Sequence, residues 1–181
     1  MFDRATRATA TTDTAAPDVL VPEEVDVVAR VGALPVDLQA TAVIANVWRA
    51  AQEARNQLER QVLRPEGLSW GGFSLLFNLW VWGPMETRAL AASMGCARAS
   101  ISSLCDTLER GGLVERRGDP SDRRLVCVGL TDPGQSTIEH VFPRFNAGES
   151  RLVAGMSADE RELLATLLRR LVHSVREVTD Q

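Results

Sequence analysis

Four hydrogen-bonding side chains lie close together in one short segment of the chain, at Arg98, Ser100, Ser102 and Ser103. Apolar side chains recur at intervals of three and four residues in the same segment, at Ala97, Ile101, Leu104, Cys105 and Leu108. This spacing predicts a helix with one buried stripe and a polar opposite face. Short hydroxyls and an arginine on such a face suit a helix that lies in the major groove of duplex DNA, where they would contact base edges and phosphates.

A cationic hairpin is predicted directly after this helix. Gly111-Gly112 ends the helix, residues 113–117 form an ingoing strand, and residues 123–130 form the outgoing one. Asp119-Pro120 opens the turn between them, because proline fixes the backbone angle that a turn requires. At this tip an arginine can enter the minor groove, where negative potential is concentrated, so we expect Arg124 to do so with Asp122 holding its guanidinium. Arg116 and Arg123 are expected to contact phosphates.

The helix and hairpin together resemble the MarR (multiple-antibiotic-resistance) family of transcriptional regulators. The matching elements are Leu108-Glu109, Gly112-Leu113-Val114, Arg116, Asp122-Arg123-Arg124 and Leu130-Thr131. The resemblance covers Pro35 to the C-terminus and matches Arg124 to the family's wing arginine. The chain departs from the family pattern at Ser103, where the family often carries a basic side chain. The resemblance therefore does not indicate which DNA sequence the helix prefers.

The resemblance implies a mainly α fold with a small β-hairpin wing (α+β), a winged helix-turn-helix with N- and C-terminal dimerisation helices. It also implies a homodimeric repressor that binds a palindromic operator and is released by a small effector. Accordingly we expect a flexible tail at residues 1–22, N-terminal dimerisation helices at 23–64, a DNA-binding domain at 65–131 and C-terminal dimerisation helices at 132–181. Within the second segment, Pro35 is expected in the first turn of a long helix that ends at Leu63.

Composition excludes several other classes of protein. The 181 residues carry a net charge of −4, and all 20 positions counted as Lys or Arg are arginine. Without lysine there is neither a phosphate-loop lysine nor a Schiff-base lysine, and no hydrolase or metalloprotease motif is present, so we expect no enzyme activity. Three cysteines and two isolated histidines lack ligand spacing, so no metal or cofactor is expected. No apolar run or leader indicates a membrane, which favours a soluble, cytoplasmic protein.

Aromatic side chains gather in the first two long helices. Core packing accounts for most of them. The resemblance favours a further role, in which Trp48, Trp70, Phe73 and Arg88 line a pocket for a small aromatic or anionic effector. Two alternatives stay open: a winged-helix protein that makes protein contacts instead of DNA contacts, and a redox-responsive regulator that uses Cys96, whose place at a helix start favours the thiolate.

Overall fold

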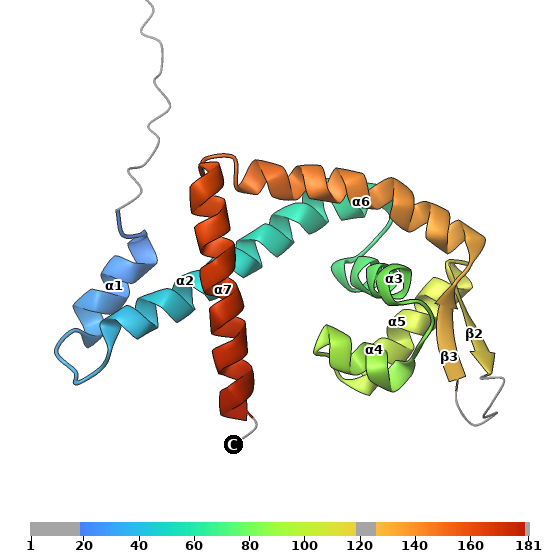
Figure 1. Cartoon of the computed structure of the whole chain (residues 1–181), viewed down its shortest axis with the longest axis horizontal. Helices are drawn as coiled ribbons and strands as arrows, with labels where there is room; N and C mark the ends of the chain where they lie inside the picture. Colours follow the sequence, from blue (N-terminus) through green and yellow to red (C-terminus); the bar gives the residue numbers. More distant parts are fainter. Residues whose placement is uncertain (1–18, 119–125, 180–181) are drawn as a thin grey trace, which may run out of the picture. The chain divides into compact units, whose positions relative to one another are not determined.

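The computed structural model describes residues 19–118 and 126–179, and it is mainly helical with one small antiparallel sheet (Figure 1). The predicted fold class is therefore confirmed. Along the chain the elements are α1 (Pro22–Val31), α2 (Leu38–Leu58), a π-helical turn (Glu59–Leu63), a 3-10 turn (Arg64–Glu66), α3 (Trp70–Trp82), β1 (Met85–Glu86), α4 (Thr87–Met94), α5 (Arg98–Arg110), β2 (Val114–Gly118), β3 (Val126–Leu130), α6 (Asp132–Leu152) and α7 (Ala158–Thr179).

The chain forms two compact units, the first through Arg49 and the second from Ala50. In the first unit α1 is fastened to α2 by a polar contact. The buried carboxylate of Glu24 accepts hydrogen bonds from Asn46 Nδ2 at 2.7 Å and from the Val21 backbone N–H at 3.2 Å. Because both carboxylate oxygens are paired, this burial does not leave a charge without partners.

Most helix starts follow the side-chain caps that the sequence contains. Ser69 Oγ accepts from the Gly72 N–H and Thr131 Oγ from the Gly134 N–H, each at 3.1 Å, which stabilises α3 and α6. Ser157 and Glu160 cap α7 reciprocally. The expectation that Pro35 lies in the first turn of the next helix is wrong. Helix α2 begins at Leu38, because Asp37 Oδ1 accepts from the Ala40 N–H at 2.9 Å and so provides the cap.

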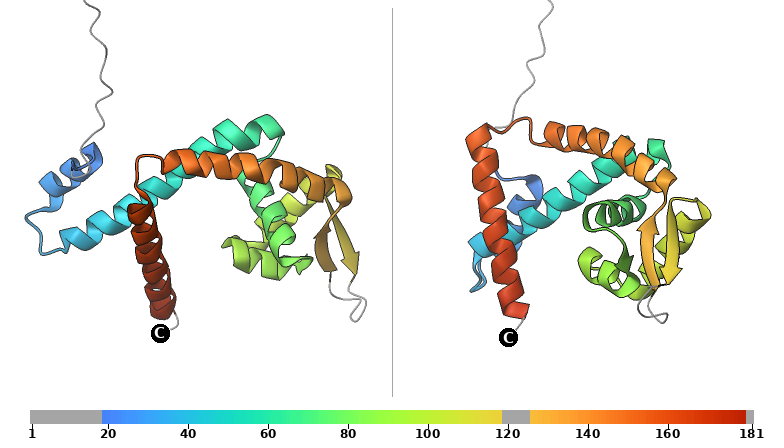
Figure 2. Two further views of the ribbon diagram at one scale, coloured as in Figure 1. Left: turned by 45° about the horizontal axis from the view of Figure 1, so that its top comes forward. Right: turned by 45° about the vertical axis from the view of Figure 1, so that its right-hand side comes forward.

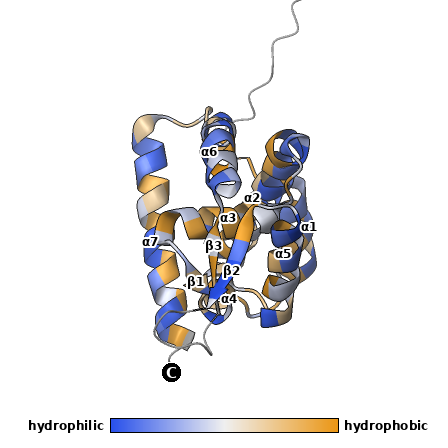
Figure 3. Cartoon of the chain, turned by 90° about the vertical axis from the view of Figure 1, so that its right-hand side faces the viewer, coloured by the Kyte–Doolittle hydropathy of each residue, from blue (hydrophilic) through white to orange (hydrophobic). Residues whose placement is uncertain are grey.

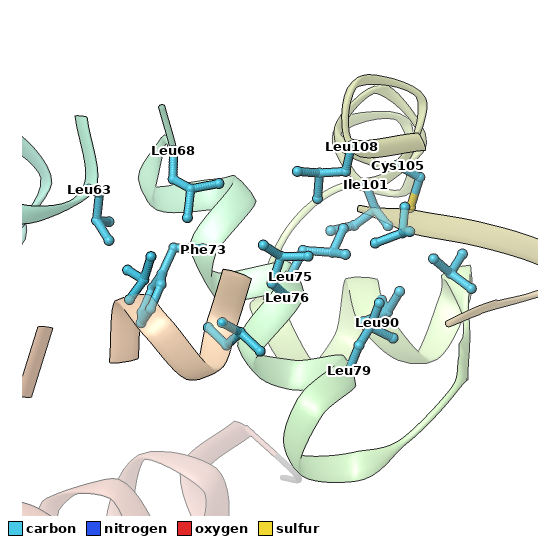
Figure 4. Packing of buried hydrophobic residues seen from close by; sticks show 14 of the residues in the cluster. Leu63, Leu68, Phe73, Leu75, Leu76, Leu79, Leu90, Ile101, Cys105 and Leu108 are labelled. Carbon is cyan, nitrogen blue, oxygen red and sulfur yellow. The ribbon is translucent and has the colours of Figure 1, made fainter. Parts of the chain in front are cut away.

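The hydrophobic core of the second unit is built by the π-helical turn, α3, α4, α5, α6 and the sheet (Figure 4). Its fully enclosed side chains are Leu63, Leu75, Leu76, Leu90, Ile101, Cys105, Val114, Val128, Ile138 and Val141. Helix α5 contributes Ile101, Cys105 and Leu108 from a single face. The predicted buried stripe of this helix is therefore confirmed, and it fixes which face of α5 is left outward.

The sheet has three strands in the order β1-β3-β2, all antiparallel. Strand β2 pairs with β3 from Val114↔Leu130 to Gly118↔Val126, which is the predicted hairpin. Strand β1, with Met85↔Val128, was not foreseen: it has two residues, too few to show the alternation that identifies a strand in a sequence. This strand anchors the hairpin to the start of α4.

Helix α7 has no buried residue between Ala158 and Val178. One side of it is nevertheless apolar, and Figure 3 shows orange and blue residues alternating along it. The large apolar side chains are 37 to 75% exposed, at Leu163, Leu164, Leu167, Leu168, Val172, Val175 and Val178. Such an extended apolar face normally marks a surface of association. Among the residues that the structure describes, no helix is both long and apolar enough to cross a membrane.

Candidate nucleic-acid interface

Helices α4 and α5 form a helix-turn-helix that packs against the β2–β3 ribbon (Figure 2). Gly95, between the helices, has the left-handed conformation (φ 61°), and the Cys96 N–H donates to the Ala91 carbonyl at 3.0 Å. A glycine adopts this conformation without the clash that a Cβ would cause. The turn is therefore tight, and α5 begins at Arg98 with its polar face outward.

All four predicted groove-facing residues of α5 are exposed: Arg98, Ser100, Ser102 and Ser103. No ion pair engages the Arg98 guanidinium within the part of the chain that the structure describes. At the preceding position, Ala97 offers no side-chain cap, so the backbone N–H groups of the first turn remain available to an anion. The exposed start of α5 thus combines a free cation with outward-facing backbone donors.

Arg116, on β2, has partners that the sequence did not indicate. Its guanidinium contacts Glu109 through Nη1 and Asp106 Oδ1 through Nη2, the latter at 2.6 Å, both carboxylates being on α5. The same Nη2 lies 3.4 Å from the Ser102 carbonyl, and the Arg116 backbone N–H donates to Glu109 Oε1 at 3.3 Å. The hydrogen bond to Asp106 raises the pKa of Arg116 above its ordinary value. We call this set of contacts, from Arg116 to Asp106, Glu109 and Ser102, the Arg116 clamp.

The contacts of Arg116 within the protein differ from the phosphate contact that the sequence predicts. A phosphate contact was expected, but the guanidinium is directed at two carboxylates within the protein, and its side chain is only 28% exposed. The guanidinium thus joins β2 to α5, and the phosphate contact of Arg116 stays a prediction. The remaining wing residues of the prediction, Asp122, Arg123 and Arg124, lie outside the described residues.

A second junction ties the base of the ribbon to α6. Thr131 donates its N–H to the Leu113 carbonyl at 3.2 Å and its hydroxyl to the Gly112 carbonyl at 2.6 Å. Gly134, in the first turn of α6, passes so close that a Cβ there would stand 1.8 Å from the Leu113 oxygen. Only glycine permits this approach, so the start of α6 is locked onto the end of the helix-turn-helix.

Two of the four residues predicted to bind an effector line the same hollow. Trp70 and Phe73 line one hollow, with Phe77 and Phe142 among the other residues of its wall. Trp48 is 72% exposed and belongs to the first unit. Arg88 does not line that hollow, and its Nε lies 2.6 Å from Glu86. Aromatic residues of α6 were not assigned to a pocket from the sequence, because nothing local indicates which helix they will face.

The cysteines differ strongly in their surroundings. Cys96 is exposed, with its Sγ 3.3 Å from the Met94 carbonyl, while Cys127 is half-buried. Cys105 is fully buried, and burial raises the pKa of its thiol. All three are free thiols. Cys105 therefore packs as a small core residue, as the sequence suggested.

Comparison with known proteins identifies the class of protein that this arrangement defines. The helix-turn-helix with its ribbon wing is that of winged-helix transcriptional regulators, and residues 68–126 match the model of the MarR family. The HTH-type transcriptional regulator YwaE of Bacillus subtilis is 40% identical over 156 residues, which cover 84% of this chain and 91% of YwaE. The chain belongs to the MarR family of transcriptional regulators, which confirms the resemblance seen in its motifs.

Solved structures share the same fold. AbsC, a MarR family transcriptional regulator from Streptomyces coelicolor, superposes with a TM-score of 0.69 at 23% identity, covering 78% of this chain and 97% of AbsC. A mutant MarR from E. coli in complex with operator DNA superposes with a TM-score of 0.67 at 22% identity, covering 75% of this chain and 99% of that one.

Proposed function

We propose that the protein is a homodimeric repressor that binds a palindromic duplex operator and acts as a regulator, without enzyme activity, on DNA in the cytoplasm. Residues 65–131 form the DNA-binding part, and residues 23–64 and 132–181 form the dimer interface. The observation that carries the proposal is the outward polar face of α5, held beside a two-stranded wing by the Arg116 clamp. A helix of this width enters a major groove, and the wing reaches the groove beside it.

DNA contacts divide into two kinds. Arg98, at the exposed start of α5, reaches a guanine edge or a phosphate, while Ser100, Ser102 and Ser103 donate to bases or phosphates. Arg124 is proposed to enter the minor groove, with Asp122 orienting it and Arg123 on a phosphate. In a two-fold dimer the half-sites then lie about one helical turn apart.

DNA binding is tested by fluorescence anisotropy with duplex from upstream of the protein's own gene and a scrambled duplex, at two salt concentrations. We expect tighter binding to the upstream duplex and a steep fall with salt, because bound cations are released. Arg98→Ala should weaken specific binding by about tenfold, and Arg124→Ala should also weaken it. The control is Arg64→Ala, an exposed arginine in the 3-10 turn, outside α4, α5 and the ribbon. Equal, weak binding to both duplexes at either salt would favour the protein-contact alternative.

Dimerisation is supported by the exposed apolar side of α7. Apolar residues at intervals of three and four give a stripe that a second copy would bury. Leu164→Glu should convert the dimer to a monomer, measured by light scattering coupled to size-exclusion chromatography. His173→Glu, on the opposite side of the same helix, is the matched control and should leave the dimer intact. A monomeric wild-type protein would contradict this part of the proposal.

A further inference from the structure

Helices α3 and α6 of the second unit line an open hollow with a volume of about 260 Å³. Five of its lining residues are aromatic: Trp70, Phe73, Phe77, Phe142 and Phe145. They come from positions three or four apart on α3 and three apart on α6, so each helix presents one aromatic row to the other. We call this hollow the aromatic pocket.

The rings of the aromatic pocket touch one another in a continuous wall. Phe73 and Phe145 stack with centroids 4.3 Å apart, and Phe77 and Phe142 stack at 5.3 Å. The Trp70 ring is tilted against the Phe145 ring, with their centroids 5.8 Å apart. An aromatic face carries negative electrostatic potential, so the ring faces that this stacking leaves open toward the hollow attract a cation. The guanidinium of Arg55 already lies 5.6 Å from the centroid of the Trp70 ring.

Polar groups at the pocket favour the same sign of charge. Among the described residues that line it, Glu149 is the one charged side chain; it is exposed, and one of its oxygens accepts from Asn146 Nδ2 at 3.1 Å. The Asn78 amide is occupied on both sides, donating to the Ser74 carbonyl at 2.8 Å and accepting from Ser93 Oγ at 2.5 Å. One N–H and the oxygen of this amide are thus engaged, while within the described part of the chain the carboxylate of Glu149 has an oxygen free for a cation.

We infer that the aromatic pocket binds an organic cation, an aromatic or alkyl quaternary ammonium, whose charge lies over the phenyl rings and near Glu149. The inference rests on the proposed regulatory function and names the chemistry of its effector. It replaces the anionic ligand suggested by the sequence, since Arg88 does not line the pocket and is paired with Glu86.

Isothermal titration calorimetry of the full-length protein tests the inference, with benzyltrimethylammonium as the cation and benzoate as the aromatic anion at equal ionic strength. Glu149→Gln removes the charge and keeps the size of the side chain, and should weaken cation binding about three- to fivefold, as expected for a partly exposed ion pair. Phe142→Leu removes one ring of the wall and should weaken it about fivefold. Glu139→Gln is the matched control, because Glu139 is exposed on the same helix and does not line the pocket.

The expected result is binding of benzyltrimethylammonium in preference to benzoate, weakened by both pocket variants and unchanged in Glu139→Gln. Circular dichroism of each variant shows whether it is folded, and Glu149→Gln replaces an exposed side chain that the core does not need. Preference for benzoate, no binding of the cation, or binding that Glu149→Gln and Phe142→Leu leave unchanged would overturn the inference.

The same preparations are titrated with the upstream duplex to separate the two proposals. Specific DNA binding without cation binding would refute the aromatic pocket as a cation site and leave the repressor proposal standing. Cation binding without specific DNA binding would refute the repressor proposal and leave the aromatic pocket standing as a cation site.

Discussion

Replacing Arg116 with glutamine tests whether the clamp positions the wing or whether this arginine contacts DNA. The variant loses two ion pairs, to Asp106 and Glu109, whose side chains are 59% and 39% exposed. Water screens such pairs, so each contributes about 0.2–1 kcal/mol, and the two together contribute about 0.4–2 kcal/mol to the free energy of unfolding. For a chain of this length that corresponds to a fall in Tm of about 1–8 °C.

The same loss should appear in DNA binding, because the variant must fix the angle between β2 and α5 when it binds. If the whole of this energy is transferred to that step, the affinity of each protomer for its half-site falls by about two- to thirtyfold. The slope of log affinity against log salt should stay the same, because the number of phosphates that the protein neutralises is unchanged. If Arg116 neutralised a phosphate directly, its replacement would instead make that slope shallower by about 0.9 for each protomer, about 1.8 for the dimer.

A double-mutant cycle of Arg116→Gln with Glu109→Gln, followed by urea unfolding, measures the pairing itself. We expect a coupling of about 0.5 kcal/mol or more, so that the double variant is barely less stable than Arg116→Gln alone. Arg64→Gln, which removes an exposed arginine elsewhere, serves as the control for loss of charge. Zero coupling together with a reduced salt slope would show that the reasoning is wrong and that Arg116 belongs to the DNA contacts.

Two further predictions concern stability. Gly134→Ala should lower the free energy of unfolding by about 1–3 kcal/mol, because its Cβ would collide with the Leu113 carbonyl. Gly155→Ala, with no neighbour within 4 Å, should cost little, and equal urea midpoints for the two variants would contradict the close approach. The backbone hydrogen bond with Ser157 lowers the pKa of Glu160 below its ordinary value of 4.5. The ionised Glu160 carboxylate therefore stabilises the fold fully at a pH above the ordinary pKa, and this stabilisation disappears as the pH falls through the lowered pKa. Glu160→Gln should be less stable than wild type near neutral pH and equal to it in stronger acid, and urea midpoints that differ equally at both would refute this.

Local signals were sufficient for the ends of most elements. A cap such as Ser69 or Thr131 and a left-handed glycine such as Gly95 act within a few residues, so the sequence displays both partners of the interaction. The start of α2 was predicted wrongly because two local signals, Pro35 and Asp37, lie close together in the chain. A proline is tolerated in a first turn, but the carboxylate of Asp37 makes a hydrogen bond that fixes the start of α2.

Interactions between elements were beyond the reach of sequence patterns. The clamp joins Arg116 on β2 to residues seven and ten positions earlier on α5, across the helix end at Gly111-Gly112, and the periodicity of neither element shows such a pairing. The aromatic pocket likewise needs Phe73 and Phe145 to face each other from helices far apart in the chain. Each helix shows its own apolar stripe, but only tertiary packing determines which stripes meet.

Helix α6 connects the two sites that these observations define. Its first turn, at Gly134, is locked onto the Leu113 carbonyl at the base of the wing, and its middle carries Phe142 and Phe145 in the aromatic pocket. An α-helix rises about 1.5 Å per residue and transmits a displacement along its axis with little compression. A ligand that moves α6 against α3 would therefore move the wing base as well. Linkage between two binding sites is reciprocal. Operator DNA should therefore lower the affinity for that ligand by the same factor by which the ligand lowers the affinity for DNA.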